Sequence, residues 1–406
     1  MDFSIPPDSD DGKPAAYCLY IRTLVHDAVF VGTAPVVTAD PNALQQQAEK
    51  MMNRAGYDYI RGGTGEGASL DANRRAFRQW QLIPRVLTPT NPRDLSVTLF
   101  GEKYDSPILM APFGIQGVIH QDKEIGVAAA CAALRVPFIL STAASTSFED
   151  LVHAVPSSPK WYQLFWPRDD ELTVSLLARA RACEFKVLVV TLDVWTMTWR
   201  PLDLDHANFG RLIANGSRIG LTDPVFLRKF ADATGGLTPA ELKTEADAYW
   251  ASEVVPGSSR SWEDLAFLRE HWDGPIVLKG IMTTEDALLA AQHGADGIIV
   301  SNHGGRQVDG SYGTLDVLPE IVDAVGDRLT VLVDSGFRTG ADVIKGLALG
   351  AKGVLVGRPV AYGLGIHGRK GAEAVLAGLL ADVDTTMGYL GAKSIADLKP
   401  SILRMA

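Results

Sequence analysis

Four short apolar runs between residues 275 and 358 decide the fold: PIVLKG at 275–280, GIIVSN at 297–302, LTVLVDSG at 329–336 and KGVLVGR at 352–358. Each run ends in a polar or glycine-containing turn, after which an Ala- and Leu-rich helical pattern begins. A strand pattern that alternates with a helix pattern is typical of βα units. The strands of such units form a parallel sheet.

Four similar runs precede this stretch, namely PILMAP from residue 107, VPFIL from 136, KWYQLF from 160 and KVLVVTLD from 186. Eight such strands are the number that closes a (β/α)8 barrel, which commonly uses about 250 residues as one unit. We therefore predict an α/β fold with a TIM barrel over residues 107–376. Residues 1–106 are expected to form an N-terminal helical extension packed on the barrel, with one helix over 42–54. Residues 377–406 are expected to form a C-terminal helix and tail.

One interval between the predicted strands is anomalous. The fourth and fifth runs start at residues 186 and 275, and this gap exceeds its neighbours by about 60 residues. Connections of such length are usually lids, binding loops or disordered linkers. Because a TIM barrel carries its active site at the C-terminal ends of its strands, we interpret residues 203–262 as a lid over that site.

Composition excludes several classes of protein. The chain carries 38 Lys and Arg against 48 Asp and Glu, a formal net charge of −10, with no run of basic residues. This balance argues against nucleic acid and anionic membranes as partners. The start of the chain lacks the features of a signal peptide, and the longest uncharged apolar run, 125–134, is about half of a membrane span. The three cysteines are scattered along the chain, a pattern that is typical of reduced thiols. We therefore expect a cytoplasmic protein without a metal site.

Polar side chains at the ends of the sixth and fourth runs suggest acid–base chemistry. The sixth run ends in SNHGGRQ at 301–307, which places the proton acceptor His303 near the cation Arg306. The fourth run ends at Asp193, which could orient an imidazolium, and Arg200 follows with a side chain suited to carboxylates. The alternatives are a histidine in an ordinary surface loop, a helix cap at Asp193 and a solvated Arg200.

The remaining strand ends suggest a phosphorylated cofactor. Lys279 on the fifth run is either a Schiff-base former or a fixed charge for a developing anion, and Gln163 on the third could pair with a heterocycle. The last two runs end in DSGFR at 334–338 and GR at 357–358, where barrels commonly bind phosphate. The alternatives are that Lys279 reaches past the strand end into solvent and that Gln163 is a buried side chain bonded to the backbone. Together these groups outline a bound flavin mononucleotide (FMN).

From about residue 42 to residue 368 the sequence resembles the FMN-dependent α-hydroxy-acid oxidising enzymes, on the motif SNHGGRQ and the phosphate loop after the seventh run. The resemblance implies His303 as the base with Asp193 as its partner, and Tyr59, Arg200 and Arg306 as ligands of the substrate carboxylate. Tyr59 and Lys279 would also be catalytic. The implied FMN contacts are Pro112, Phe113, Gly114, Ser141, Gln163, Thr191, Lys279, Ser301, Asp334, Gly336, Arg338, Gly357 and Arg358. A homotetramer or larger homo-oligomer is also implied.

Three features bear on the branch of this family. The long insertion and the segment TDPVF at 222–226 are most similar to lactate 2-monooxygenases. Gly114 stands where the simple oxidases usually have Ala, which favours the same branch. Phe165 stands where many members have a tyrosine whose hydroxyl faces the substrate. Loss of that hydroxyl removes a hydrogen bond worth about 1–3 kcal/mol if its partner is left unpaired.

The resemblance therefore leads us to expect FMN-dependent oxidation of a small, lactate-like L-2-hydroxy acid by O2, with oxidative decarboxylation of the bound 2-keto acid. One alternative is an oxidase that releases the 2-keto acid and H2O2. An alternative of another class is a non-redox aldolase or isomerase that uses Lys279 as a Schiff base on a sugar phosphate.

Overall fold

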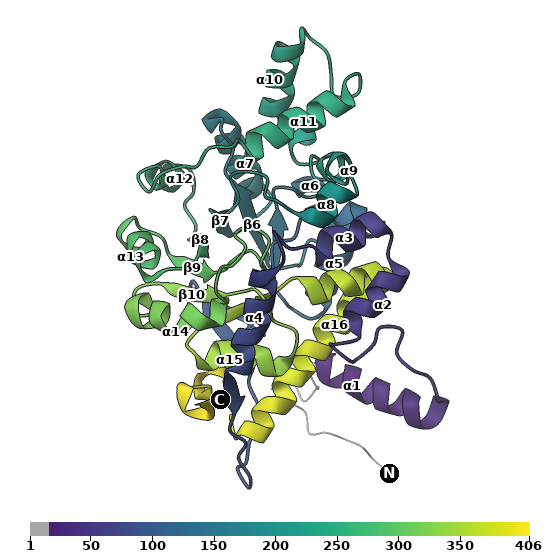
Figure 1. Cartoon of the computed structure of the whole chain (residues 1–406), viewed down its shortest axis with the longest axis vertical. Helices are drawn as coiled ribbons and strands as arrows, with labels where there is room; N and C mark the ends of the chain where they lie inside the picture. Colours follow the sequence, from purple (N-terminus) through teal and green to yellow (C-terminus); the bar gives the residue numbers. More distant parts are fainter. Residues whose placement is uncertain (1–15) are drawn as a thin grey trace.

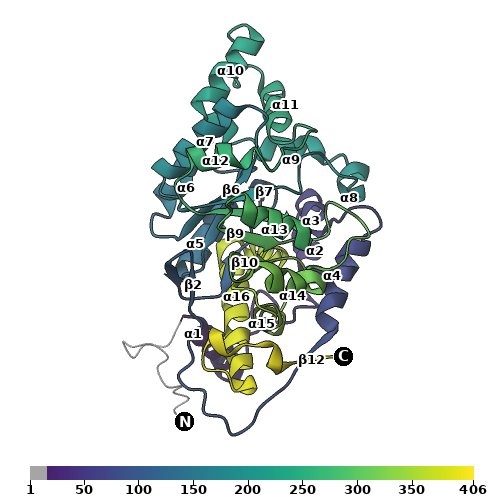
Figure 2. The ribbon, with the colours of Figure 1, turned by 90° about the vertical axis from the view of Figure 1, so that its left-hand side faces the viewer.

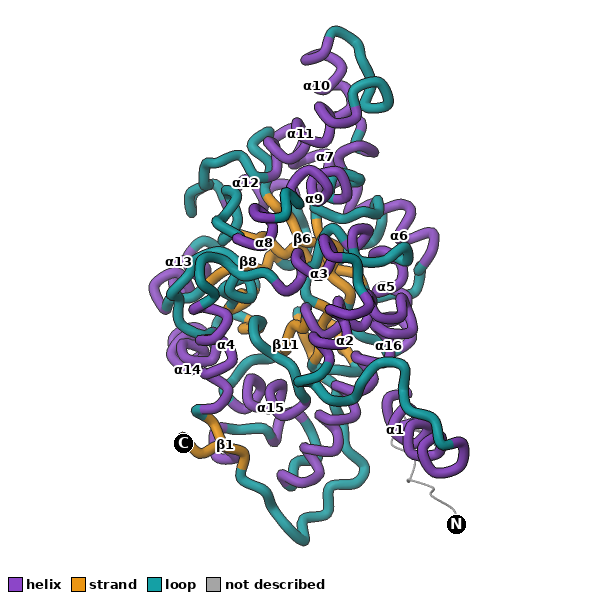
Figure 3. Tube along the Cα trace, turned by 45° about the vertical axis from the view of Figure 1, so that its right-hand side comes forward, coloured by secondary structure: helices purple, strands orange, loops and turns teal. Residues whose placement is uncertain are grey.

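The described part of the chain, residues 16–406 of a computed structural model, is organised around a closed barrel of eight parallel strands (Figures 1 and 3). The strands follow one another in chain order, and the last pairs with the first. They are β4 (Ile108–Met110), β5 (Phe138–Ser141), β6 (Lys160–Phe165), β7 (Val187–Thr191), β8 (Ile276–Ile281), β9 (Gly297–Val300), β10 (Thr330–Val333) and β11 (Gly353–Val356). Each strand coincides with one of the eight predicted runs, so the predicted TIM barrel is confirmed.

Helices cover the outer face of the barrel (Figure 3). They are α5 (Lys123–Ala133), α6 (Phe148–Ala154), α7 (Asp170–Ala182), α12 (Leu265–His271), α13 (Thr284–Gln292), α14 (Thr314–Val325), α15 (Gly340–Ala348) and α16 (Arg358–Leu390). Strands buried on both faces explain the nearly continuous apolar runs in the sequence. The boundary drawn at residue 376 falls inside α16, which continues across a kink at His367 and Gly368. Within residues 16–406, no helix is long and apolar enough to cross a membrane.

The inside of the barrel is packed and closed at its N-terminal mouth. Inward-facing residues include Leu109, Ile139, Trp161, Val187, Val189, Val277, Ile299, Leu332 and Leu355. A hairpin of β2 (Val97–Leu99) and β3 (Glu102–Tyr104) covers this mouth, where the Trp161 indole nitrogen donates to the Tyr104 hydroxyl at 3.1 Å. Phe100 and Gly101 both have positive φ at the hairpin turn, as a tight turn of this kind requires. The polar strand ends lie at the opposite mouth.

The segment before the barrel is helical but differs from the prediction. It contains α1 (Ala16–His26), a π-helix (Asp27–Val31), α2 (Leu44–Met51), α3 (Arg54–Arg61) and α4 (Ala68–Arg78), and then β1 (Trp80–Leu82), which pairs with β12 (Leu403–Met405). The helix predicted over 42–54 is α2, which is shorter and ends at Met51. Asn53 has an extended backbone and accepts a hydrogen bond from the Gly56 amide as the N-cap of α3.

The insertion between β7 and β8 forms the end of the molecule farthest from α1 (Figures 1 and 2). It contains α8 (Pro201–Asp205), α9 (Phe209–Asn215), α10 (Pro224–Thr234) and α11 (Lys243–Val254). The buried Asp223 caps α10 by accepting from the amides of Val225 and Phe226, and its carboxylate lies 3.2 Å from Arg179 of α7. Phe226 and Trp250 pack edge to face between α10 and α11. The segment predicted to be a lid is therefore helical, and its role as a lid stays a prediction.

Candidate active site

A cavity opens at the C-terminal mouth of the barrel. Its walls contain most of the predicted site residues: Tyr59, Pro112, Phe113, Gly114, Ser141, Phe165, Lys279, His303, Arg306, Asp334, Gly336, Arg338, Gly357 and Arg358. Gln163, Ser301 and Asp193 hydrogen-bond to wall residues. Arg200 lines an adjoining cavity, and Thr191 pairs in register with Phe165. The fold thus gathers all of the predicted residues at one mouth.

His303 and Asp193 form a hydrogen-bonded pair from the loops after β9 and β7. His303 Nδ1 lies 3.0 Å from Asp193 Oδ1. Because the carboxylate only accepts, Nδ1 is assigned the proton and Nε2 remains a free acceptor. His303 has a left-handed backbone with φ of 57°. This conformation is uncommon for a residue with a side chain and persists only where its surroundings hold it.

The electrostatics of this pair favour a neutral imidazole beside a carboxylate. Burial lowers the pKa of His303, and the charge of Asp193 opposes this only in part. Burial raises the pKa of Asp193, but the neighbouring charges of His303 and Lys279 outweigh burial, and the pKa of the carboxyl falls below its usual value. Such a pair can accept a proton at neutral pH and stabilise the imidazolium that forms.

A pair of asparagines holds the His303 loop. The side-chain amides of Asn73 on α4 and Asn302 donate to each other's oxygens at 2.8 and 2.9 Å, and both residues are buried. Asn302 also accepts from the Gly305 amide at 3.1 Å. Sequence reasoning missed both residues. Asn302 lies within the motif SNHGGRQ and could have been included, whereas no local pattern points to Asn73.

Two guanidinium groups face the cavity beside this base. Arg306 donates to the Gly62 carbonyl at 2.6 Å, and its other terminal nitrogen is buried with no hydrogen-bond partner among the described residues. The Arg306 guanidinium lies over the ring of Tyr59, 5.0 Å from its centroid. Arg200 donates to Gln307 at 2.7 Å, and burial with the Arg306 charge lowers the pKa of Arg200 to about 10, so it stays charged at neutral pH. A carboxylate here would relieve the repulsion between the two cations.

Two buried polar atoms at the ends of β6 and β7 fit a flavin ring. Gln163 Nε2 and Thr191 Oγ1 have no hydrogen-bond partner among residues 16–406, although Gln163 Oε1 accepts from Ser141 at 2.7 Å. An unmade buried hydrogen bond costs about 1–3 kcal/mol, so a ligand that completes both bonds is favoured. An amide donor beside a hydroxyl complements the mixed acceptor and N–H edge of the flavin pyrimidine ring.

Lys279 supplies a buried positive charge near these atoms. Its ammonium lies 2.9 Å from Ser301 Oγ and 3.6 Å from the Asp334 carboxylate, and the residue is only 3% exposed. An ammonium held in this way can balance negative charge on a bound ring.

The loops after β10 and β11 provide an anion site. Gly336 has φ of 89°, and a Cβ atom there would lie 2.9 Å from the Phe77 ring, so only glycine fits without strain. Burial lowers the pKa of Arg338. Burial and the neighbouring arginines lower the pKa of Arg358 to about 9, and Arg358 already donates to three backbone carbonyls. Buried cations gathered at glycine-rich turns suit a phosphate group.

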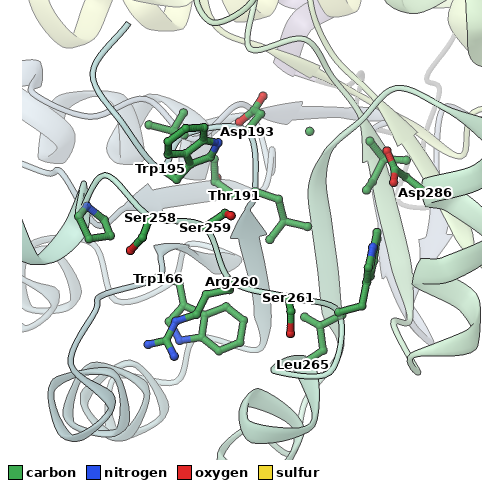
Figure 4. Close-up of a pocket in the computed structure, with 16 residues that line it drawn as sticks. Trp166, Thr191, Asp193, Trp195, Ser258, Ser259, Arg260, Ser261, Leu265 and Asp286 are labelled. Carbon is green, nitrogen blue, oxygen red and sulfur yellow. The ribbon is translucent and has the colours of Figure 1, made fainter.

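Two further cavities lie near the C-terminal ends of the strands. One adjoins the first, shares Tyr59, Phe165, His303 and Arg306 with it and extends beneath α9 and α11. The other lies outside the ends of β7 and β8, with Asp193, Trp195 and Ser258 on its walls (Figure 4). Because neither His303 nor Lys279 lines this last cavity, we assign the chemistry to the mouth of the barrel.

A TIM barrel that combines a buried base, two facing guanidiniums and groups complementary to a flavin phosphate defines a flavin-dependent oxidoreductase. The family model described as FMN-dependent dehydrogenase matches residues 48–405, and the chain belongs to this family. Its cofactor is FMN, as predicted, and it oxidises α-hydroxy acids. The non-redox aldolase or isomerase is set aside.

Individual relatives cover almost the whole chain. The protein is 48% identical over 391 residues to the FMN-dependent alpha-hydroxy acid dehydrogenase qulF of Penicillium citrinum, which covers 96% of both chains. It is 35% identical to an L-lactate oxidase of Lysinibacillus sphaericus, over 94% of this chain and 95% of that one. A crystal structure of mandelate oxidase superimposes with a TM-score of 0.76 at 34% identity, over 91% of this chain and 98% of the other.

Proposed function

We propose that the protein oxidises an L-2-hydroxy acid to the 2-keto acid and passes the two electrons to O2, which is released as H2O2. The observation that carries this proposal is the convergence of His303, Arg306 and the flavin-complementary groups on one cavity. FMN supplies a two-electron acceptor when bound. Two electrons and two protons leave the substrate, and O2 receives them.

Each side chain then has a defined task. Arg306 and Arg200 bind the substrate carboxylate, with the hydroxyl of Tyr59 as a further donor. Burial raises the pKa of Tyr59 against the opposing charges of the arginines, so the phenol keeps its proton. His303 Nε2 accepts a proton from the substrate, and the carboxylate of Asp193 stabilises the resulting imidazolium.

Residues from most of the strand ends would hold FMN. Ser141, Gln163 and Thr191 would bind the ring edge, Lys279 with Ser301 would balance its charge, and the backbone of 112–114 would contact it. Asp334, Gly336, Arg338, Gly357 and Arg358 would bind the sugar-alcohol chain and phosphate. The unpaired atoms of Gln163 and Thr191 support this arrangement.

A second outcome is oxidative decarboxylation, in which a 2-hydroxy acid and O2 give the shortened carboxylic acid, CO2 and water. The cavity beneath α9 and α11 favours it, because a 2-keto acid enclosed there would be retained. Gly114 gives it no support: a Cβ atom at Gly114 would lie 2.7 Å from the Ala143 carbonyl oxygen, so packing explains the glycine. The ring of Phe165 lines both cavities and adds no hydrogen bond to either outcome.

Product analysis tests both outcomes. Purified enzyme is mixed anaerobically with a panel of L-2-hydroxy acids, and bleaching of the flavin absorbance is recorded. Turnover in air is then followed by H2O2 and CO2 assays. One H2O2 per 2-keto acid supports the oxidase, and one CO2 per O2 without H2O2 supports decarboxylation. A flavin that no 2-hydroxy acid reduces would overturn the proposal. Homo-oligomeric assembly and a cytoplasmic location remain predictions from the sequence.

A further inference from the structure

The apolar cavity that adjoins the flavin cavity has so far been considered only as a place that would retain a 2-keto acid. It has a volume of about 120 Å³ and extends from the base toward the helices of the insertion. We propose that the substrate is a 2-hydroxy acid with a bulky apolar side chain, such as an aryl group or an alkyl chain of several carbons, and that the insertion binds this side chain. The inference rests on the proposed function and deepens it.

The two cavities meet at the reacting groups, which sets the direction of the substrate. Both are lined by Tyr59, His303 and Arg306. A carboxylate bound to Arg306, with its hydroxyl at His303, sits at this junction. The flavin cavity lies on one side of this junction and the apolar cavity on the other. The side chain of the substrate, which is the third substituent of the α-carbon, would therefore extend into the apolar cavity.

The walls beyond the junction are apolar. The barrel contributes Ile115 and Phe165, and the insertion contributes Leu212, Ile213 and Val254. Two polar groups beyond the junction already have partners: Trp250 Nε1 donates to the Gly216 carbonyl at 3.1 Å, and Arg200 donates to Gln307 at 2.7 Å. A polar side chain on the substrate would therefore lose its hydration without replacement, whereas an apolar one would not.

The size of the cavity favours more than a methyl group. Burial of each CH2 group is worth about 0.8 kcal/mol, or roughly a fourfold gain in affinity. Lactate offers one methyl group to the apolar walls and leaves most of the cavity unfilled. We therefore expect kcat/KM to rise by about fourfold for each added carbon until the cavity is filled.

Residues on one helix allow a matched test. Ile213 on α9 lines the cavity and is half-buried, whereas its neighbour Ala214 is exposed and does not line it. Ile213→Trp fills the cavity, and Ala214→Trp adds comparable bulk to the same helix outside it. The ratio of kcat/KM for (S)-mandelate to that for L-lactate should fall at least tenfold in Ile213→Trp and stay at the native value in Ala214→Trp.

Anaerobic flavin reduction by the native holoenzyme gives the first result. The panel is glycolate, L-lactate, (S)-2-hydroxyhexanoate and (S)-mandelate, and the shift of the flavin spectrum on binding the matching 2-keto acids is measured separately. The larger acids should give the higher kcat/KM and the tighter keto-acid binding. The inference would be overturned if lactate or glycolate reduced the flavin with an equal or higher kcat/KM than the larger acids. It would also be overturned if the two tryptophan variants had equal effects. Neither result would contradict the proposed function. Reduction by no acid would overturn the proposed function itself.

Discussion

At the scale of single residues, the depressed pKa of His303 sets the pH dependence of the enzyme. The neutral imidazole is the active base, and burial keeps its pKa below the ordinary value of about 6.5. The rate of flavin reduction should therefore be level through neutral pH and fall only as the pH drops below about 6.5, when His303 gains a proton. Stopped-flow reduction between about pH 4.5 and 8.5 measures this.

Asp193→Asn changes the same profile in a defined direction. Burial lowers the pKa of His303, and the negative charge of Asp193 opposes this decrease. Without that charge, the pKa of His303 should fall further, and the acid limb of the pH profile should move to lower pH. The maximal rate should also fall, by about 10²- to 10⁴-fold, because the imidazolium loses its partner. An acid limb displaced to higher pH in the variant would contradict the assignment.

The buried pair of Asn73 and Asn302 gives a second prediction. Asn73→Ala leaves the Asn302 side chain without two of its hydrogen bonds and frees the strained His303 loop. We expect a loss of about 1–3 kcal/mol in the free energy of unfolding. The limiting rate of flavin reduction should fall while FMN content and substrate Kd stay near native values. Asn42→Ala, an exposed change in the same segment, is the control, and equal rates in both variants would refute the positioning role.

These residues also indicate how far sequence reasoning reaches. His303 and Arg306 could be predicted because the motif that holds them is contiguous and follows a clear strand. Asn73 could not, because its partner lies 229 residues away and only the fold brings them together. Among the walls of the apolar cavity, Phe165 could be placed from the strand that carries it, whereas Ile115 and Ile213 could not, since they come from distant segments.

At the scale of elements, strands were easier to predict than helix boundaries. Both faces of the barrel strands are buried, and so each strand is a continuous apolar run that stands out from its surroundings. The helix predicted over 42–54 is present as α2 but ends at Met51, because Asn53 is the N-cap of α3 and a cap is decided by one side chain. In the insertion, by contrast, Asp223-Pro224 is a readable helix start.

The cap at Asp223 supports a prediction about the insertion. Asp223→Ala removes two hydrogen bonds to backbone amides and one carboxylate partner of Arg179. We expect a local loss of about 0.5–2 kcal/mol from the cap alone. Hydrogen exchange should become faster in α10 and α11 and stay unchanged in the barrel strands. Asp232→Ala, an exposed change on α10, is the control. Faster exchange throughout the molecule would show that the insertion does not open on its own.

At the scale of the whole molecule, an acidic chain with a net charge of −10 concentrates cations at one mouth of the barrel. Besides burial, the charges of Arg306, Arg338 and Arg200 lower the pKa of Arg358, and the charge of Arg306 lowers the pKa of Arg200. Without an anionic ligand this cluster repels itself in a buried setting, where charge interactions are poorly screened. The cofactor phosphate should therefore contribute to the stability of the fold as well as to the chemistry.

Removal of FMN tests this directly. The apoprotein should unfold at a lower temperature than the holoenzyme, because a ligand present at 100 times its Kd stabilises by about 2.7 kcal/mol. Inorganic phosphate should restore part of the lost Tm, whereas sodium chloride at the same ionic strength should not, since screening alone cannot replace a bound anion. Arg338→Ala should weaken the phosphate effect, while Arg404→Ala, an exposed change near the C-terminus, should leave it intact. Equal stabilisation of the apoprotein by phosphate and by chloride would contradict an anion site at these arginines.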